Sequence, residues 1–112
     1  MPAVEACVDA PRAARYLAQL CGHLKHLQEL PRRHDAPGAG PPAVISIQCD
    51  DSRGSIEFDL GMLTLQATAG QLLLGAHSER EADLATLQRL VGDRVAAIGR
   101  RDALTVQWQP AD

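Results

Sequence analysis

The sequence predicts an α+β domain in which a curved antiparallel sheet carries two helices on one face. Two segments, 11–30 and 78–99, repeat apolar residues at helical spacing, and four short segments between them alternate apolar and polar side chains. Connections as short as those between the four segments force antiparallel hairpins. Such a meander offers one apolar face, and two amphipathic helices need that face to bury their own apolar stripes.

The first strand and the first helix are marked by the residues between them. Residues 3–9 alternate apolar and polar side chains, which predicts a strand. Asp9 is placed as the N-cap of the next helix, and Pro11 suits its first turn because an N–H there needs no partner. The helix is expected over 11–30 and ends at Pro31. Its predicted buried stripe consists of Ala13, Leu17, Leu20, Leu24 and Leu27.

A proline- and glycine-rich segment, 31–42, follows this helix. Prolines cannot join a strand ladder and the segment offers little to bury, so we expect an irregular, exposed loop. The loop is a connector rather than a domain boundary, because one helix and one strand could not fold alone before it. Residues 1–112 are therefore expected to form a single domain.

The second half of the chain contains most of the sheet and the second helix. Ser78 and Glu81 form a capping box, with Ser78 as N-cap, and Gly99 is placed to end the helix. The predicted order is β-α-β-β-β-β-α-β, an arrangement that resembles the TATA-binding-protein-like or helix-grip type of fold. The strands are expected at 44–49, 55–59, 62–68, 71–77 and 104–108.

Composition narrows the classes of function. The net charge is −3 and only 3% of residues are aromatic, so a nucleic-acid partner is not expected. No segment reaches the roughly 20 apolar residues of a membrane span, and the N-terminus lacks the pattern of a secretory signal. Three cysteines, Cys7, Cys21 and Cys49, are an odd number without framework spacing. We therefore expect reduced thiols, with Cys21 buried and inert, and a cytoplasmic protein.

The first helix carries the candidate functional residues. His23 and His26 lie about 60° apart on the helix and can present both imidazoles to one object, with Arg15, Tyr16 and Gln19 one or two turns earlier near the same side. A histidine pair can bind a transition metal when further ligands join it. The alternative is that both imidazoles flank the apolar stripe and form only local hydrogen bonds.

Four motifs give the chain a family resemblance. They are the run from Arg15 to His26 (RYLAQLCGHLKH), Gly-x-Ile-Glu-Phe at 54–58, Gly-x-x-x-Leu at 61–65 and Leu-x-Val-x-Trp at 104–108. Together they resemble the bacterial family called domain of unknown function 2218. Members of that family occur as small free-standing proteins and also attached to siderophore-interacting flavin reductases. The resemblance implies a link with iron handling, but it implies no established activity.

Three functional hypotheses follow. The first is a small accessory protein that binds iron, haem or another metal chelate through His23 and His26, assisted by Tyr16 or Arg15. The second is a cofactor-free enzyme with acid–base catalysis by Tyr16 and His23, and with Glu57 in reserve, in a pocket between sheet and helix. The third is a homodimeric interaction module. Its contact surface would use Met62, Leu73 and Val44, which are expected to point away from the core.

Overall fold

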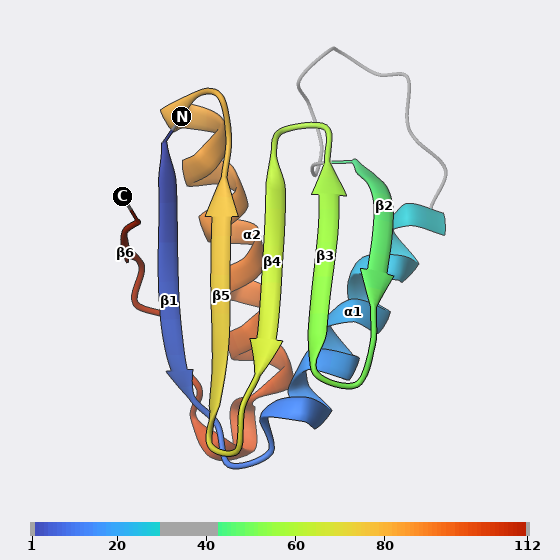
Figure 1. Ribbon diagram of the computed structural model, residues 1–112, viewed down its shortest axis with the longest axis vertical. Coiled ribbons are helices and arrows are strands. Elements are labelled where there is room, and N and C mark those ends of the chain that lie inside the picture. Colours follow the sequence, from blue (N-terminus) through green and yellow to red (C-terminus); the bar gives the residue numbers. More distant parts are fainter. Residues whose placement is uncertain (1, 30–42, 112) are drawn as a thin grey trace.

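The structure is a computed structural model that describes residues 2–29 and 43–111. Six strands form one sheet in the order β2-β3-β4-β5-β1-β6, and two helices lie on one face of it (Figure 1). The predicted fold class is confirmed. The expected loop at 31–42 and the end of the first helix lie outside the described residues. The elements are β1 (Ala3–Asp9), α1 (Ala13–Glu29), β2 (Val44–Cys49), β3 (Arg53–Phe58), β4 (Met62–Ala67), β5 (Gln71–His77), α2 (Glu81–Ile98), the 3-10 helix η1 (Arg100–Asp102) and β6 (Gln109–Pro110).

Strand pairing follows the predicted meander. β2 to β5 pair with their chain neighbours, and every pairing in the sheet is antiparallel. β1 pairs with β5 over seven residue positions, so the first strand of the chain joins the sheet next to the last strand of the meander. Consequently α1 crosses behind the sheet to the β2 edge, while α2 lies behind β1, β5 and β4 (Figure 1).

The core lies between the sheet and the two helices. Alternate strand residues are buried on the face that the helices cover, and the residues between them face away from the helices. The largest fully buried side chains come from both layers: Leu17, Leu20, Leu24, Ile56, Leu63, Leu72 and Leu87. We call the other side of the sheet, which no helix covers, the open face. Its strand residues are more polar than those of the core.

Both predicted helix starts are wrong in detail. α1 begins at Ala13, and the Asp9 carboxylate instead accepts a hydrogen bond from Gln71 Nε2 at 3.2 Å while Asp9 ends β1. α2 begins at Glu81, with Arg80 at the N-cap position and no side-chain cap. Ser78 lies two residues before this position, where its backbone N–H extends the sheet by donating to the Pro2 carbonyl oxygen. Its hydroxyl is buried and has no hydrogen-bond partner among the described residues, so it does not cap the helix.

The last predicted strand, 104–108, is also wrong. Gly99 ends α2 as expected, and the chain then forms η1 before it returns to the sheet. Leu104 packs on Gly99, where an added Cβ would lie 2.4 Å from the leucine side chain. Ordered pairing is limited to β6 at Gln109–Pro110, opposite Val4 and Glu5. Packing of Leu104 therefore takes precedence over the alternating pattern.

Two further observations bear on the sequence-based expectations. Val44 is buried in the core rather than pointing away from it, because the β2–β3 register shifts between Val44 and Ser46 and a shift of one residue reverses the face. In the part of the chain that the structure describes, no helix is both long enough and apolar enough to span a membrane.

Candidate functional site

Four of the six site residues predicted from the sequence form a polar ridge on α1. Arg15, Gln19, His23 and His26 are all exposed and recur at intervals of four, four and three residues, which keeps them within about 80° of arc on the helix. Tyr16 belongs to the same helix but is buried at 5% exposure. The structure thus places the histidine pair on the solvent side of the helix layer.

The ridge supplies two imidazoles for a metal ion. His23 and His26, three residues apart on the helix, have Cβ atoms roughly 5–6 Å apart. Among the residues that the structure describes, no group of three or more histidine, cysteine, aspartate or glutamate side chains is placed to hold a metal ion. Metal binding by the pair therefore stays a prediction.

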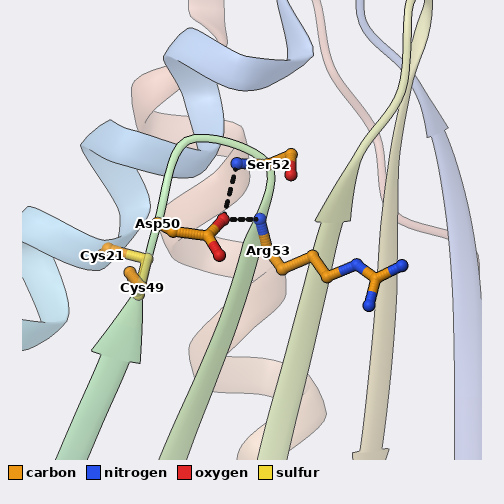
Figure 2. The surroundings of a disulfide bond; sticks show 5 residues. All are labelled: Cys21, Cys49, Asp50, Ser52 and Arg53. Carbon is orange, nitrogen blue, oxygen red and sulfur yellow. Dashed lines mark hydrogen bonds between the residues drawn. A yellow bond between two sulfur atoms is a disulfide. The ribbon is translucent and has the colours of Figure 1, made fainter.

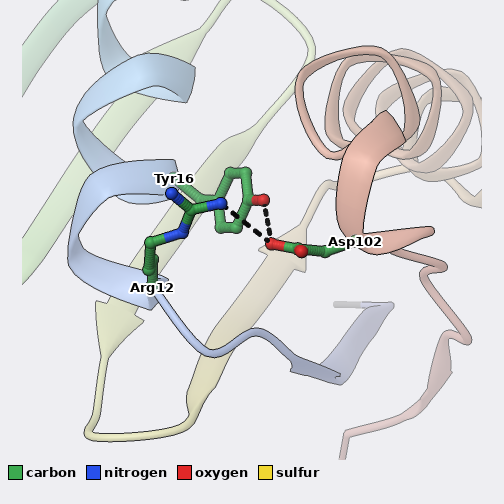
Figure 3. A network of polar contacts seen from close by, with 3 residues as sticks. All are labelled: Arg12, Tyr16 and Asp102. Carbon is green, nitrogen blue, oxygen red and sulfur yellow. Dashed lines mark hydrogen bonds and ion pairs between the residues drawn. The ribbon is translucent and has the colours of Figure 1, made fainter.

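Tyr16 lies in a polar cluster with two other residues. Its hydroxyl donates a hydrogen bond to Asp102 Oδ2, and Arg12 Nη2 lies 3.7 Å from the same oxygen (Figure 3). The hydrogen bond to Asp102, burial and the nearby carboxylate charge together raise the pKa of Tyr16 above its ordinary value. A tyrosine held in its protonated form in this way attaches α1 to η1.

The three proposed acid–base residues are not brought together. Tyr16 and His23 are separated by seven residues, about 10 Å along the helix axis, and the first is buried while the second is exposed. Glu57 is exposed on the open face of β3, on the side of the sheet opposite α1. Catalysis by this trio therefore gains no support from their positions.

The cysteines differ from the expectation of three reduced thiols. Cys21 of α1 and Cys49 at the end of β2 form a disulfide, with Cα atoms 6.9 Å apart, and Cys7 is free and exposed (Figure 2). The pair escaped sequence reasoning because the two residues are 28 positions apart, on elements of different type. The expected cytoplasmic location rested partly on reduced thiols, so the disulfide removes that part of the argument.

The surroundings of the disulfide explain how it fits. Gly54 faces Cys49 across the β2–β3 hairpin, and a Cβ on Gly54 would lie 3.0 Å from the Cys49 sulfur and 3.3 Å from the Cys21 sulfur. The hairpin turn is fastened by Asp50, whose carboxylate accepts hydrogen bonds from the amide N–H groups of Ser52 and Arg53 at 2.9 and 2.8 Å (Figure 2). These two backbone hydrogen bonds lower the pKa of Asp50.

A groove of about 710 Å³ lies on the open face of the sheet. Its floor follows a cross-strand row in which Ser55 of β3 pairs with Thr64 of β4, Thr64 with Gly75 of β5, and Gly75 with Glu5 of β1. Beside this row lie Arg53, Gln66 and Leu73, which also pair in sequence across β3, β4 and β5. With Gln48 and Cys49 of β2 in the lining as well, residues from five strands converge on one hollow.

Gly75 lies in the floor of this groove. Thr64 and Glu5 flank it on the neighbouring strands, and Gly75 itself has no side chain to fill the space between them. A Cβ at Gly75 would lie 2.7 Å from Thr64 Oγ1, which donates a hydrogen bond to the Gly75 carbonyl oxygen at 3.3 Å. Glycine is therefore required for the present packing of Thr64, and it leaves backbone groups accessible to a ligand.

Comparison with known proteins supplies the family. Residues 5–109 match the family described as an uncharacterized protein conserved in bacteria, DUF2218. The chain belongs to this family. It is similar to a solved structure, the NMR structure of PA4090 from Pseudomonas aeruginosa, with 27% sequence identity and a TM-score of 0.70 over 100% of this chain and 99% of that chain. No curated protein matches it.

The groove of this DUF2218 protein was missed by sequence reasoning. Of the six predicted site residues, Glu57 lies on the same face but does not line the groove, and the others lie on α1. Leu73, expected on a dimer contact surface, does line the groove. A signal was present, since Thr64 is a polar residue of β4 and Gly75 interrupts the apolar run of β5. Recognising that they are neighbours required the β4–β5 register, which alternation within one strand does not reveal.

Proposed function

We propose that this DUF2218 protein binds a small organic molecule in the groove on the open face of its sheet. The observation that supports the proposal is the groove itself, whose 710 Å³ falls within the roughly 300–1,000 Å³ of ligand pockets. Hydroxyl groups of Ser55 and Thr64 converge there with the charged side chains of Arg53 and Glu5. Convergent polar groups around a preformed hollow are typical of a binding site.

The groove suits a polar organic ligand better than haem. A haem iron needs an axial ligand such as histidine, cysteine thiolate, methionine or tyrosine. None of the residues that line the groove is histidine, methionine or tyrosine, and its cysteine, Cys49, is bonded to Cys21 on the helix side of the sheet. Serine, threonine and glutamine side chains instead offer hydrogen bonds to a soluble metabolite.

A screen of small organic molecules, followed by amide chemical shifts in NMR spectra, tests the proposal. We expect ligands to shift the signals of β3, β4 and β5, and Gly75→Ala to weaken binding about tenfold because its methyl group enters the hollow. Gly92→Ala is the matched control, since a Cβ there meets nothing within 4 Å. Shifts confined to α1, or equal affinity of Gly75→Ala and the native protein, would contradict the proposal.

A second candidate is binding of a metal ion or metal chelate by the ridge on α1. It is favoured by the joint exposure of His23 and His26 and by the iron-related role that the family resemblance implies. Titration with ferrous, ferric, cupric and zinc ions and with haemin tests it. We expect His23→Ala/His26→Ala to abolish binding while Lys25→Ala, a change at the exposed residue between them, preserves it. Unchanged affinity in the double variant would end this candidacy.

Self-association is the remaining alternative from the sequence. β2 forms one edge of the sheet, and Ile45 on that strand is 53% exposed, whereas Val44 is now assigned to the core. Exposed edge strands can pair with a second chain. Light scattering at high micromolar concentration tests whether the protein is a dimer, and a monomeric mass would exclude this alternative.

A further inference from the structure

Two opposite charges stand at the two sides of the open-face groove. Arg53 projects from β3 and Glu5 from β1, with β4 and β5 between them. In the described part of the chain, the ion pair is that between Arg12 and Asp102. Within those residues, neither Arg53 nor Glu5 forms an ion pair. Figure 2 shows the Arg53 side chain extending toward β4 and away from Asp50, although its own backbone N–H bonds to Asp50.

The distance between these charges suits a small ligand. Three strand spacings of about 4.8 Å separate Arg53 from Glu5, and their cross-strand rows are offset by two residues, about 7 Å along the strands. Their backbone positions are therefore roughly 16 Å apart. The Arg53 side chain is directed toward β4, so it shortens this span from one side. The remaining gap is that of a compact molecule with a charge at each end.

The groups between the two charges fit the middle of such a molecule. Ser55 and Thr64 place hydroxyl groups in the cross-strand row that ends at Glu5, and Gln66, which pairs with Arg53 in the neighbouring row, adds an amide. Leu73 supplies an apolar contact for a methylene group beside the hollow at Gly75. A ligand with a polar or short aliphatic centre would thus contact the floor along its length.

We propose that the groove binds a zwitterion the size of an amino acid or dipeptide, with its carboxylate on Arg53 and its protonated amine on Glu5. A guanidinium group matches a carboxylate because its planar fork can donate two parallel hydrogen bonds. A phosphate-rich ligand fits less well, since the single cation is accompanied by the carboxylates of Glu5 and Asp50 at the same groove. This inference rests on the proposed function and specifies its ligand.

Calorimetry with free amino acids and dipeptides, each paired with its N-acetyl and C-amide derivatives, tests the inference. We expect both derivatives to bind at least about tenfold more weakly than the parent zwitterion, because each loses one charge-assisted contact. Glu5→Gln should weaken the parent by a similar factor and leave the N-acetyl compound unaffected. Arg53→Gln should weaken the parent and leave the C-amide unaffected. Arg89→Gln, at an exposed position of α2, is the control and should change nothing.

The possible failures separate the inference from the proposed function. If no zwitterion binds, or if the derivatives bind as well as the parents, the inference is overturned. The proposed function still stands if other small molecules in the screen shift β3–β5 signals and are weakened by Gly75→Ala. Both fail together only if no compound of any charge reaches the groove. Thermal unfolding of each variant identifies any loss of affinity that arises from loss of the fold. The charge-reversed double variant Glu5→Arg/Arg53→Glu provides a second test. It should restore binding of the zwitterion in the opposite orientation.

Discussion

Helix α1 is attached to the rest of the molecule in two ways. Near its start, Tyr16 and Arg12 reach Asp102 in η1, which lies 86 residues beyond Tyr16 in the chain. Further along, Cys21 is bonded covalently to Cys49 at the end of β2. The polar attachment depends on protonation and the covalent one on oxidation. The same helix can therefore be loosened at either point by a different chemical condition.

The two attachments also stabilise the fold by different physical routes. A disulfide acts mainly by restricting the unfolded chain, and the effect grows with the length of the closed loop. The Tyr16–Asp102 hydrogen bond acts in the folded state. There the partly buried Asp102 carboxylate has less contact with water, and the Tyr16 hydroxyl replaces a water molecule as its hydrogen-bond donor. The variants below test this distinction, from the largest expected effect to the smallest.

Removal of the disulfide should have the largest effect on stability. With a sequence separation of 28, we expect Cys21→Ser/Cys49→Ser to lower the free energy of unfolding by about 3 kcal/mol, measured by urea denaturation. A reducing agent should have the same effect on the native protein and none on the double variant. Cys7→Ser is the control, because Cys7 is a free, exposed thiol. Equal stability of native and double-variant proteins would show that the bond does not form in solution.

Tyr16→Phe should have the next largest effect. Loss of the hydroxyl removes the hydrogen bond to Asp102 and should lower the midpoint of thermal unfolding by roughly 5 °C. Because the pKa of Tyr16 is raised in the folded state, its contribution is complete below the unfolded pKa of about 10 and is lost as pH rises above that value. The difference between native and Tyr16→Phe proteins should therefore shrink in alkali.

The alkaline transition can be followed at this one residue. Tyr16 is the only tyrosine of the chain, so tyrosinate absorbance reports on it alone. Asp102→Asn should bring the titration back toward the ordinary range, because the hydrogen bond to the Asp102 carboxylate and its negative charge both raise the pKa of Tyr16. A titration at the same pH in native and Asp102→Asn proteins would contradict the assigned contact.

These attachments also show what the sequence could and could not predict. Helical spacing and alternation identified both helices, the meander and the core leucines, because those patterns are set by local geometry and burial. The partners Asp102 and Cys49 escaped prediction, since each meets α1 only through tertiary packing. The open-face groove escaped for the same reason. Its row of Ser55, Thr64 and Gly75 exists only in the observed register.

A smaller change of opposite sign is expected at Ala103, which follows Asp102. Ala103 adopts φ 52°, a left-handed conformation that favours glycine. Ala103→Gly should raise the free energy of unfolding by up to about 1 kcal/mol, since relief of the strained backbone outweighs the greater freedom of glycine in the unfolded chain. Ala85→Gly, at an exposed position inside α2, should instead lower it by about 1 kcal/mol. A loss of stability in both variants would indicate that Ala103 is not strained.

The smallest expected effect concerns the hairpin turn beside Cys49. It tests whether acid destabilises the turn next to the disulfide, as alkali destabilises the Tyr16–Asp102 contact. Asp50 accepts hydrogen bonds from the backbone N–H groups of Ser52 and Arg53, so its pKa is lowered in the folded state. The resulting stability is present above the unfolded pKa of about 3.9 and is lost as pH falls through the folded value. Asp50→Ala should lower the thermal midpoint by roughly 2 °C at neutral pH.

The same variant distinguishes the turn from the disulfide. The difference between native and Asp50→Ala proteins should stay constant above about pH 5, shrink once pH falls below the unfolded pKa of about 3.9, and disappear only below the lowered folded pKa, where native Asp50 is protonated. Asp51→Ala is the control at the neighbouring exposed position and should leave the midpoint unchanged. Because the disulfide remains intact in acid, the acid effect should be equally large in the Cys21→Ser/Cys49→Ser background. A much larger effect in that background would mean that the turn and the disulfide hold α1 as one coupled unit.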